Sequence, residues 1–347
     1  MAGRELPEGT CWIKTDLIVQ TGTDDRSGAL DCLSAQNSEA VLGRKKLLQK
    51  GTTKPVVPIS PFLPEIHHRV HYRTVMDNIG EPLHHIERLD VAFNALADVV
   101  QACKMMCIAG FNHRDLSPGN IIVDKKEGRG RLSDLEFAKD HMSDLPGHHA
   151  GTPDFMAVEL IENAYGFRGR PPRTVGAIRQ LNQTIPLRHN AGHDLESILW
   201  IAIFLLYNSL VLDHDMSIER SGDDTLFVKA SQQRQYRDEL FDPSRRTRIF
   251  MGDTNLYDTM LGHFSSPSVQ ICGDIGHVET MQFKLKATYR VFETVLSEQE
   301  RGQTRNAVFL SAHNKFEGCL RTISDLFNGE KCKRVDDILW AKRHSQD

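Results

Sequence analysis

The sequence predicts an α+β fold with two unequal parts: a small N-terminal part that contains strands, and a larger C-terminal part that is mostly helical. Three observations support this prediction. Aromatic and β-branched residues dominate residues 11–20, as in a strand. Residues 88–111 repeat apolar side chains at helical spacing. After Glu159 most of the chain keeps a helical pattern, except for residues 162–193, which are rich in Arg, Gly, Pro and Asn.

The composition is that of a soluble globular protein and argues against several classes. Of the 347 residues, 40% are hydrophobic and 25% are charged. The net charge of −4 gives no basic field, so we expect neither nucleic acid nor a membrane as a partner. The longest apolar run, residues 198–207, is about half the length of a bilayer span, and the start of the chain lacks the pattern of a secretory signal. Seven scattered cysteines without a Cys-x-x-Cys pair favour reduced thiols in a cytoplasmic or nuclear protein.

The N-terminal part is predicted to span residues 1–76. After the first strand, a helical pattern begins at Ser38, a suitable N-cap, and runs to residue 50. Four prolines between residues 53 and 64 indicate an extended segment. Residues 67–76 are predicted to form a strand, and residues 77–83 a turn or connector.

The helical part is predicted to span residues 84–330 and to be followed by a C-terminal tail at 331–347. Its first helix, at 88–111, leads into a loop and then into two short apolar segments joined by a Gly-rich turn. Residues 120–137 are therefore predicted to form a β-hairpin.

One segment, residues 112–140, carries an acid, an amide and a second acid at short intervals. Asp115 precedes the hairpin, Asn120 stands at its start, and Asp134 lies near the end of its second strand. The two strands would bring Asn120 and Asp134 together, and their oxygens are hard ligands suited to Mg²⁺. Asp115 could accept a proton from a hydroxyl nucleophile or orient it. Together these groups fit phosphoryl transfer from a nucleoside triphosphate.

Three motifs in and around this segment resemble those of protein kinases. Residues 113–120, HRDLSPGN, fit the H-R-D-L-x-x-x-N catalytic loop at every fixed position. Residues 151–159, GTPDFMAVE, resemble the end of an activation segment and differ at one fixed position, where Val158 replaces proline. Residues 193–200, HDLESILW, place an acid at the start of an apolar helix. From about residue 67 to residue 207 the chain resembles the fungal-type protein kinase family.

The resemblance implies a two-lobed protein-kinase fold with a reduced β-rich N-terminal lobe, a hinge at residues 77–83 and a mostly helical C-terminal lobe. It also implies ATP and Mg²⁺ as cofactors. Asp115 would be the catalytic base, Asn120 and Asp134 would hold Mg²⁺, and residues 134–159 would form the activation segment. The other implied site residues are Arg114 and Thr152 beside the catalytic base, Asp77, Ile79 and Ile122 around the adenine, and His113, Glu159 and Asp194 as structural supports.

Two of these supports have partners that the resemblance implies. Asp194 would accept hydrogen bonds from the backbone of the catalytic loop. Glu159 would pair with an arginine near the C-terminal helices, for which residues 242–248 are the candidate segment. His189 and His193 are four residues apart and are open to two interpretations, a metal pair or loop and cap residues around Asp194.

The phosphate-binding part of the site departs most from the kinase pattern. No Gly-x-Gly-x-x-Gly sequence precedes the hinge. Lys14 is the candidate for the phosphate-binding lysine and Glu39 for its partner. An exposed strand lysine and an ordinary first-turn glutamate are the alternative interpretations of these two residues. Ser117 stands where Ser/Thr kinases carry a lysine, and Leu135 and Glu136 replace the Phe and Gly of the D-F-G motif.

The expected function is ATP- and Mg²⁺-dependent phosphoryl transfer to Ser or Thr hydroxyls of a protein substrate. Two alternatives remain open. A degenerate N-terminal lobe would fit a pseudokinase that serves as a binding or scaffold module. The spacing of Asp134 and Glu136 also resembles small-molecule kinases of the choline and aminoglycoside type. Arg114 beside Asp115 suggests control by phosphorylation of the activation segment, with Ser143 as the candidate.

Overall fold

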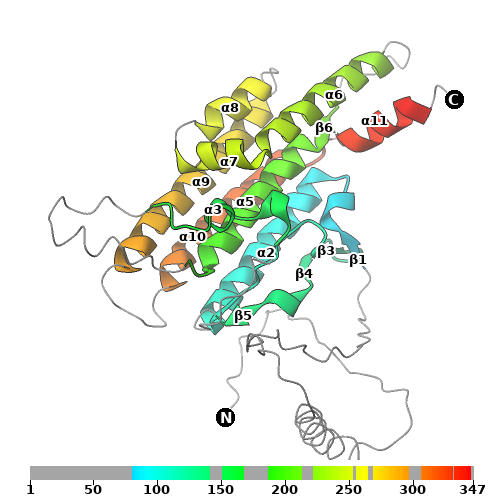
Figure 1. The fold of residues 1–347 in the computed structure, drawn as a ribbon. Coiled ribbons are helices and arrows are strands. Elements are labelled where there is room, and N and C mark those ends of the chain that lie inside the picture. The colour runs from blue at the N-terminus through cyan, green and yellow to red at the C-terminus, as the bar shows by residue number, and fades with distance from the viewer. Residues whose placement is uncertain are drawn as a thin grey trace, which may run out of the picture. The chain divides into compact units, whose positions relative to one another are not determined.

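The computed structural model describes residues 80–140, 151–167, 187–212, 222–252, 255–264, 269–296, 306–330 and 332–344 (Figure 1). The chain divides into two compact units, residues 1–77 and 78–347, and every described residue lies in the second. The elements predicted between residues 11 and 76 lie outside the described residues. So do the predicted residues Lys14, Glu39, Asp77, Ile79 and Ser143.

Helices make up most of the second unit. The long helices are α2 (Leu89–Ala109), α5 (Ala191–Tyr207), α6 (Gly222–Leu240), α9 (Val269–Leu296) and α10 (Leu310–Leu326). The shorter ones are α3 (Val158–Glu162), α7 (Pro243–Met251), α8 (Leu256–His263) and α11 (Val335–His344). Short 3₁₀ segments are η1 (Leu83–His85), η2 (Leu135–Phe137), η3 (Pro153–Phe155) and η4 (Asn306–Phe309).

Small antiparallel sheets accompany these helices. β1 (Gly80–Pro82), β3 (Ile121–Asp124) and β4 (Gly130–Leu132) form one sheet in the order β1-β3-β4. β2 (Phe111–Asn112) pairs with β5 (Lys139–Asp140), and β6 (Ser209–Val211) pairs with β7 (Cys332–Arg334). The combination of many helices with small sheets agrees with the predicted α+β class.

The hairpin predicted at residues 120–137 is formed by β3 and β4, with Ile122 opposite Arg131. Its second strand is shorter than predicted and ends at Leu132. Asp134 takes the left-handed conformation (φ 58°), which is incompatible with a continuing strand, and η2 follows it. Asp134 therefore lies just beyond the hairpin, between the end of β4 and the start of η2.

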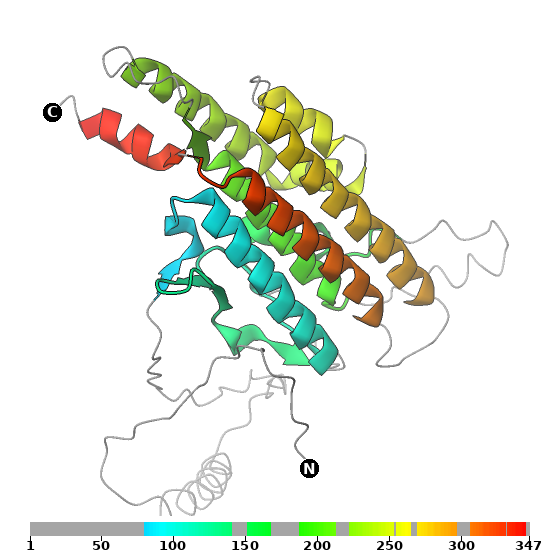
Figure 2. The ribbon, with the colours of Figure 1, turned by 180° about the vertical axis from the view of Figure 1, so that it is seen from behind.

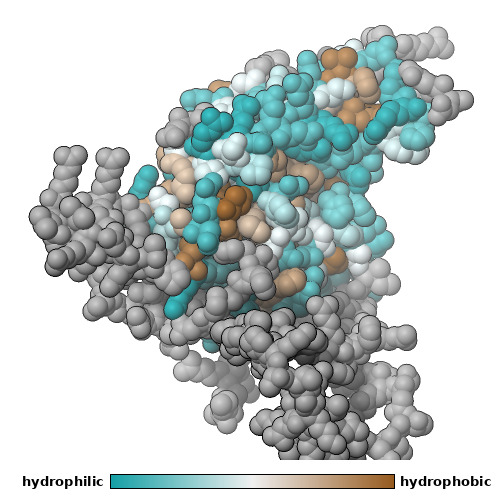
Figure 3. All heavy atoms as spheres, viewed as in Figure 1, coloured by the Kyte–Doolittle hydropathy of each residue, from teal (hydrophilic) through white to brown (hydrophobic). Residues whose placement is uncertain are grey.

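Helix α2 confirms the helix predicted at residues 88–111 and forms part of the core. It ends where Gly110 takes a left-handed conformation (φ 93°) and donates its N–H to the Met106 and Cys107 carbonyls. By length and composition alone α2 could cross a membrane, but most of its residues are buried inside the protein, where it packs on α5, α10 and β4 (Figure 2). The described residues on the face seen in Figure 3 are mostly hydrophilic, with hydrophobic residues scattered among them.

Helix α5 carries the apolar run at residues 198–207, and nearly all of its side chains are buried. A capping box closes its N-terminus. Asn190 Oδ1 accepts a hydrogen bond from the Gly192 N–H (2.8 Å), and His193 Nδ1 accepts one from the Asn190 N–H (3.2 Å). His193 is therefore a cap residue, which is one of the two interpretations that its spacing from His189 left open.

The hairpin is fixed to α2 by a buried acid and a glycine. Asp98 on α2 accepts hydrogen bonds from the Gly130 N–H (3.0 Å) and from Arg129 Nε (2.7 Å). Its other oxygen accepts one from Arg321 on α10 at 2.7 Å. A Cβ atom at Gly130 would come within 2.1 Å of the Ala95 carbonyl oxygen, so this close approach requires glycine. These contacts determine where the residues that follow the hairpin lie.

The segment predicted as a C-terminal tail is part of the folded unit. Strand β7 pairs with β6, and α11 packs along α6 (Figure 1). Ala230 of α6 forms a small second core with Val335 and Leu339 of α11. The Val335 N–H also donates to the Asn208 carbonyl (2.9 Å), just after α5. Residues 332–344 are thereby fastened to the C-terminal end of α5.

The buried side chain of Asp274 on α9 makes the stability of the fold depend on pH. Its side chain is fully buried, and neither carboxylate oxygen has a hydrogen-bond partner among the residues that the structure describes. Burial raises the pKa of Asp274 from 3.8 to about 8. Between pH 3.8 and about 8, Asp274 therefore keeps its proton in the folded protein but has lost it in the unfolded chain. The contribution of Asp274 to the free energy of unfolding falls as the pH rises through this window and stays constant above it.

We expect Asp274→Asn, which keeps the shape of the side chain but cannot ionise, to raise the melting temperature more at about pH 8 than at about pH 5. Thermal unfolding followed by circular dichroism at both pH values measures this difference. Asp325→Asn removes an exposed acid from α10 and serves as the control. A gain from Asp274→Asn that does not change with pH would contradict the assignment.

Candidate active site

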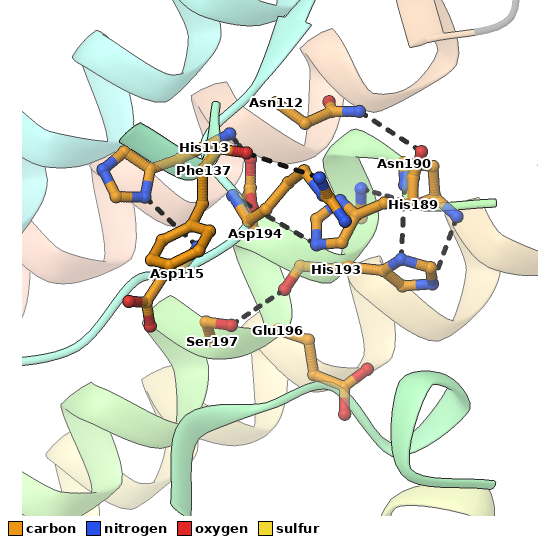
Figure 4. Close-up of polar contacts among 12 residues, drawn as sticks. Asn112, His113, Asp115, Phe137, His189, Asn190, His193, Asp194, Glu196 and Ser197 are labelled. Carbon is orange, nitrogen blue, oxygen red and sulfur yellow. Dashed lines mark hydrogen bonds and ion pairs between the residues drawn. The ribbon is translucent and has the colours of Figure 1, made fainter. Parts of the chain in front are cut away.

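The predicted catalytic loop, residues 113–120, connects β2 to β3 and is held in place by a buried acid. Asp194, in the first turn of α5, accepts hydrogen bonds from the backbone N–H groups of His113 (2.8 Å) and Arg114 (3.0 Å). Its two oxygens take one bond each (Figure 4). The bonds support Arg114 in the left-handed conformation (φ 77°), which is unfavourable for residues other than glycine. Burial raises the pKa of Asp194, and the hydrogen bonds from the two N–H groups oppose this shift.

His113 ties the catalytic loop to the residues that follow the hairpin. Its side chain is fully buried. Nδ1 accepts a hydrogen bond from the Asp115 N–H (3.3 Å), so the proton of the neutral ring lies on Nε2. Nε2 donates this proton to the Ser133 carbonyl at 3.0 Å. The imidazole therefore connects the backbone at Asp115 to the backbone next to Asp134.

Asp115 receives hydrogen bonds on both carboxylate oxygens. Thr152 donates its N–H (3.0 Å) and its hydroxyl (3.2 Å) to Oδ1. Asn120 Nδ2 donates to Oδ2 (3.3 Å) and to the Asp115 carbonyl (2.9 Å). The residue is half-buried, so part of it remains accessible. The structure thus brings Asp115, Asn120 and Thr152 together and holds the carboxylate in one orientation.

The predicted metal ligands Asn120 and Asp134 are brought near each other by Ser133. The Ser133 N–H and hydroxyl each donate to the Asn120 carbonyl at 2.9 Å, and Asp134 is the next residue. Asp134 is exposed, and neither its carboxylate nor Asn120 Oδ1 accepts a hydrogen bond from the described residues. Hard oxygens with available lone pairs suit Mg²⁺. Within the described ranges no group of three or more His, Cys, Asp or Glu is placed to hold a metal.

Among the residues predicted to contact adenine, Ile122 lies in the described part of the chain. It is half-buried on β3. A Cβ at Gly80 would come within 2.3 Å of the Ile122 side chain, so β1 and β3 approach closely here. The Leu83 N–H, at the end of the predicted hinge, donates to the Pro118 carbonyl at 3.1 Å. The end of the hinge segment is thus bonded to the catalytic loop.

Glu159 has partners other than the predicted arginine. It is fully buried in α3 and accepts hydrogen bonds from the Gly166 N–H (2.8 Å) and from His193 Nε2 (3.0 Å). Burial raises the pKa of Glu159. Arg246, the buried arginine of residues 242–248, instead donates to two backbone carbonyls of the predicted activation segment. The predicted pairing is not formed among the described residues, because the start of α5 places His193 against Glu159.

Sequence reasoning missed Ser133 and Asp98, which position the site without belonging to a motif. Ser133 could have been found by asking which donor closes the hairpin against the Asn120 carbonyl. Asp98 lies between Ala97 and Val99 in the apolar stripe of α2. An acid inside such a stripe indicates a buried pair, but its partners come from distant residues that the pattern does not identify.

We expect Asp194→Ala to lower the free energy of unfolding by about 3 kcal/mol, because each buried N–H left without an acceptor costs about 1–3 kcal/mol. Urea unfolding followed by tryptophan fluorescence measures this loss. Glu81→Ala, which removes an exposed ion pair with Lys125 (2.9 Å), serves as the control and should have little effect. Similar losses for the two variants would contradict the role of Asp194 under the loop.

Comparisons with known proteins find similarity to protein kinases. A family model described as fungal protein kinase matches residues 12–206, more than half of the chain. The chain is 37% identical over 79 residues to a dual serine/threonine and tyrosine protein kinase of Strongylocentrotus purpuratus, which covers 23% of this chain and 8% of the relative. It is 34% identical over 77 residues to the protein of the same name from Xenopus tropicalis, with 22% and 8% covered.

A third relative aligns over a longer stretch. The probable serine/threonine-protein kinase mkcB of Dictyostelium discoideum is 26% identical over 147 residues, which cover 37% of this chain and 20% of the relative. The chain spans 8% of the length of the dual-specificity kinases and a fifth of the length of mkcB, so these similarities concern one part of each protein. The match of the family model over more than half of the chain shows that this protein belongs to the fungal protein kinase family.

Proposed function

We propose that this protein is an ATP- and Mg²⁺-dependent kinase that transfers a phosphoryl group to Ser or Thr hydroxyls of a protein. The observation that supports it best is the fixed orientation of the Asp115 carboxylate, which receives donors from Thr152 and Asn120 and stays partly accessible. Membership of a protein kinase family and similarity to serine/threonine kinases support the same reaction class.

In the proposed reaction the substrate hydroxyl oxygen bonds to the γ-phosphorus, and the bond from that phosphorus to the β,γ-bridging oxygen breaks as ADP leaves. Asp115 accepts a hydrogen bond from the hydroxyl, aims its oxygen and takes its proton. The proton then passes to the phosphate product or to water. Thr152 and Asn120 hold the carboxylate in advance, so it needs no reorientation during the reaction.

Asn120 Oδ1 and the Asp134 carboxylate are the groups that would hold Mg²⁺, which would neutralise charge on the phosphate oxygens. The fit rests on their available oxygens and on the bonds that tie Ser133 to the Asn120 carbonyl. The exposed Glu136 adds a second carboxylate near Asp134. Both acids would therefore favour a cation at this end of the hairpin.

The proposal includes a two-lobed fold in which residues 1–76 complete the ATP site, with Lys14 and Glu39 on its phosphate side. A protein substrate is favoured over a small molecule because Arg114 and residues 151–159 follow the protein-kinase pattern. The net charge of −4 favours neither nucleic acid nor a membrane as a partner, and the cysteine pattern favours the cytoplasm or nucleus.

We expect Asp115→Asn to lower kcat by about 10²–10⁴-fold, because the variant keeps the hydrogen bond to Thr152 but cannot take a proton. Transfer from radiolabelled ATP to a degenerate peptide library containing Ser and Thr, with the full chain as enzyme, measures the rate. Asp325→Asn, an exposed change on α10, is the matched control.

Equal transfer by Asp115→Asn and the unchanged protein would remove the catalytic role of Asp115. If the unchanged protein binds Mg–ATP but transfers no phosphate, the binding-module alternative replaces the proposal. Transfer to choline or aminoglycosides but not to peptides would favour the small-molecule alternative.

We expect Asp134→Asn to raise the Mg²⁺ concentration for half-maximal transfer by at least about tenfold, because even residues behind a metal ligand change metal affinity by about 10–100-fold. A titration of the rate with Mg²⁺ at saturating ATP measures the shift. Glu127→Gln removes an exposed acid from the turn of the same hairpin and should leave the titration unchanged. An unshifted midpoint for Asp134→Asn would exclude this residue as a ligand.

A further inference from the structure

Val158, the position where the activation-segment motif departs from proline, has a specific hydrogen-bond partner. It is the first residue of α3, and its side chain is fully buried. Its backbone N–H donates to Glu196 Oε1 at 2.8 Å. A proline has no N–H and could not make this bond.

The backbone at this position is compatible with proline, so the valine is not there for conformational reasons. Proline is common at the first residue of a helix, where its fixed φ fits and a missing N–H costs no helical bond. The preceding residue, Ala157, is extended (φ −61°, ψ 145°), which is the conformation that a following proline favours. The feature that valine adds is therefore the N–H that Glu196 accepts.

Glu196 is an acid in the second turn of α5, a helix whose side chains are almost all buried. It is fully buried in α5, two residues after Asp194, and its side chain extends away from the Asp194 contacts (Figure 4). Trp200 Nε1 donates to Oε1 and the Tyr289 hydroxyl donates to Oε2, both at 3.2 Å. Burial raises the pKa of Glu196 to about 8, although the bonds from Val158 and Trp200 oppose the shift. Burying an acid here is costly, and the hydrogen bonds offset part of that cost.

Arg246 on α7 holds the other end of the same segment. Its fully buried guanidinium donates to the Pro153 carbonyl (2.8 Å) and to the Asp154 carbonyl. The guanidinium also lies 5.4 Å from the centre of the Trp200 ring, and its charge favours the ionised form of Glu196. Glu196 and Arg246 therefore both contact the Trp200 side chain. Arg246 bonds to the start of residues 153–158, and Glu196 bonds to their end.

We propose that Glu196 and Arg246 are positioning residues that fix residues 153–158 and, through Thr152, the orientation of Asp115. The role in catalysis rests on the phosphoryl transfer proposed above. Thr152 is the residue before Pro153 and donates both of the bonds to Asp115 Oδ1. Any displacement of Pro153 therefore moves these donors, and a shift of about 1 Å can cost about a hundredfold in rate.

A double-mutant cycle tests the bond between Val158 and Glu196. Val158→Pro removes the donor and also displaces Glu196 Oε1, because the proline Cδ takes the place of the N–H hydrogen, and Glu196→Ala removes the acceptor. Each change is expected to lower kcat by at least about tenfold, with the KM for ATP unchanged. Because both changes delete the same bond, the double variant should lose no more than the larger single loss. Multiplying losses would overturn the proposal.

Two further variants separate positioning from folding. Glu196→Gln keeps an acceptor for the Val158 N–H and should restore most of the rate that Glu196→Ala loses. Gln233→Ala removes a buried amide that bonds the carbonyls of Leu206, Tyr207 and Ser209 near the C-terminal end of α5. It should lower the melting temperature but leave the kcat of the folded enzyme unchanged. If Glu196→Gln is as slow as Glu196→Ala, or if Gln233→Ala lowers kcat equally, the effect is one of stability and the proposal fails.

Hydrogen exchange of the full chain gives a readout that does not need catalysis. Amides in residues 154–160 should exchange faster in Glu196→Ala and Val158→Pro, and at the unchanged rate in Glu196→Gln and Gln233→Ala. If the unchanged protein transfers no phosphate, the proposed function fails while this measurement still tests the hold on the segment. Unaltered exchange in Glu196→Ala would show that Glu196 does not fix these residues.

Discussion

The two hydrogen bonds from the His113 and Arg114 N–H groups to Asp194 are the interaction on which the site depends. They join a loop between two short strands to the first turn of a helix whose side chains are almost all buried. A carboxylate is well suited to this place, because it accepts two bonds at once and lies near the positive end of the helix dipole. The same bonds stabilise the unfavourable backbone of Arg114, so the loop geometry is maintained by α5 and not by the loop itself.

A short series of hydrogen bonds connects the Asp194 contacts to the rest of the site. The His113 ring bonds to the Ser133 carbonyl, and the Ser133 hydroxyl donates to the Asn120 carbonyl. The Asn120 amide in turn donates to the Asp115 carbonyl. Each of these residues bonds to backbone as well as to side chains, so the groups are tied to fixed peptide units. As a result, the side chains of Asp115 and Asn120 have fixed orientations in the folded chain.

Much of this arrangement could be predicted from the sequence, since the information is local. The helix at α2 follows from apolar spacing, and the hairpin from two apolar segments around a Gly-rich turn. The hydrogen-bond partners of Glu159 and of the Val158 N–H could not be predicted in the same way. These partners are His193 and Glu196 on α5, and they reach α3 only in the folded chain. The spacing of apolar residues does not identify which donor a buried acid will meet. Residues 331–347 were predicted as a tail because no local pattern shows the pairing of β7 with β6, a strand far away in the chain.

The close approach of Gly130 to α2 also determines the register of the hairpin. A shift of β4 by one residue would bring Arg129 or Arg131 to the place where even a Cβ would lie 2.1 Å from the Ala95 carbonyl oxygen. Sliding of the two strands is therefore blocked by steric exclusion from outside the hairpin, in addition to its own hydrogen bonds. Asn120 directly precedes β3 and Asp134 lies two residues after β4, so their relative offset is thus determined by a helix that contains neither of them.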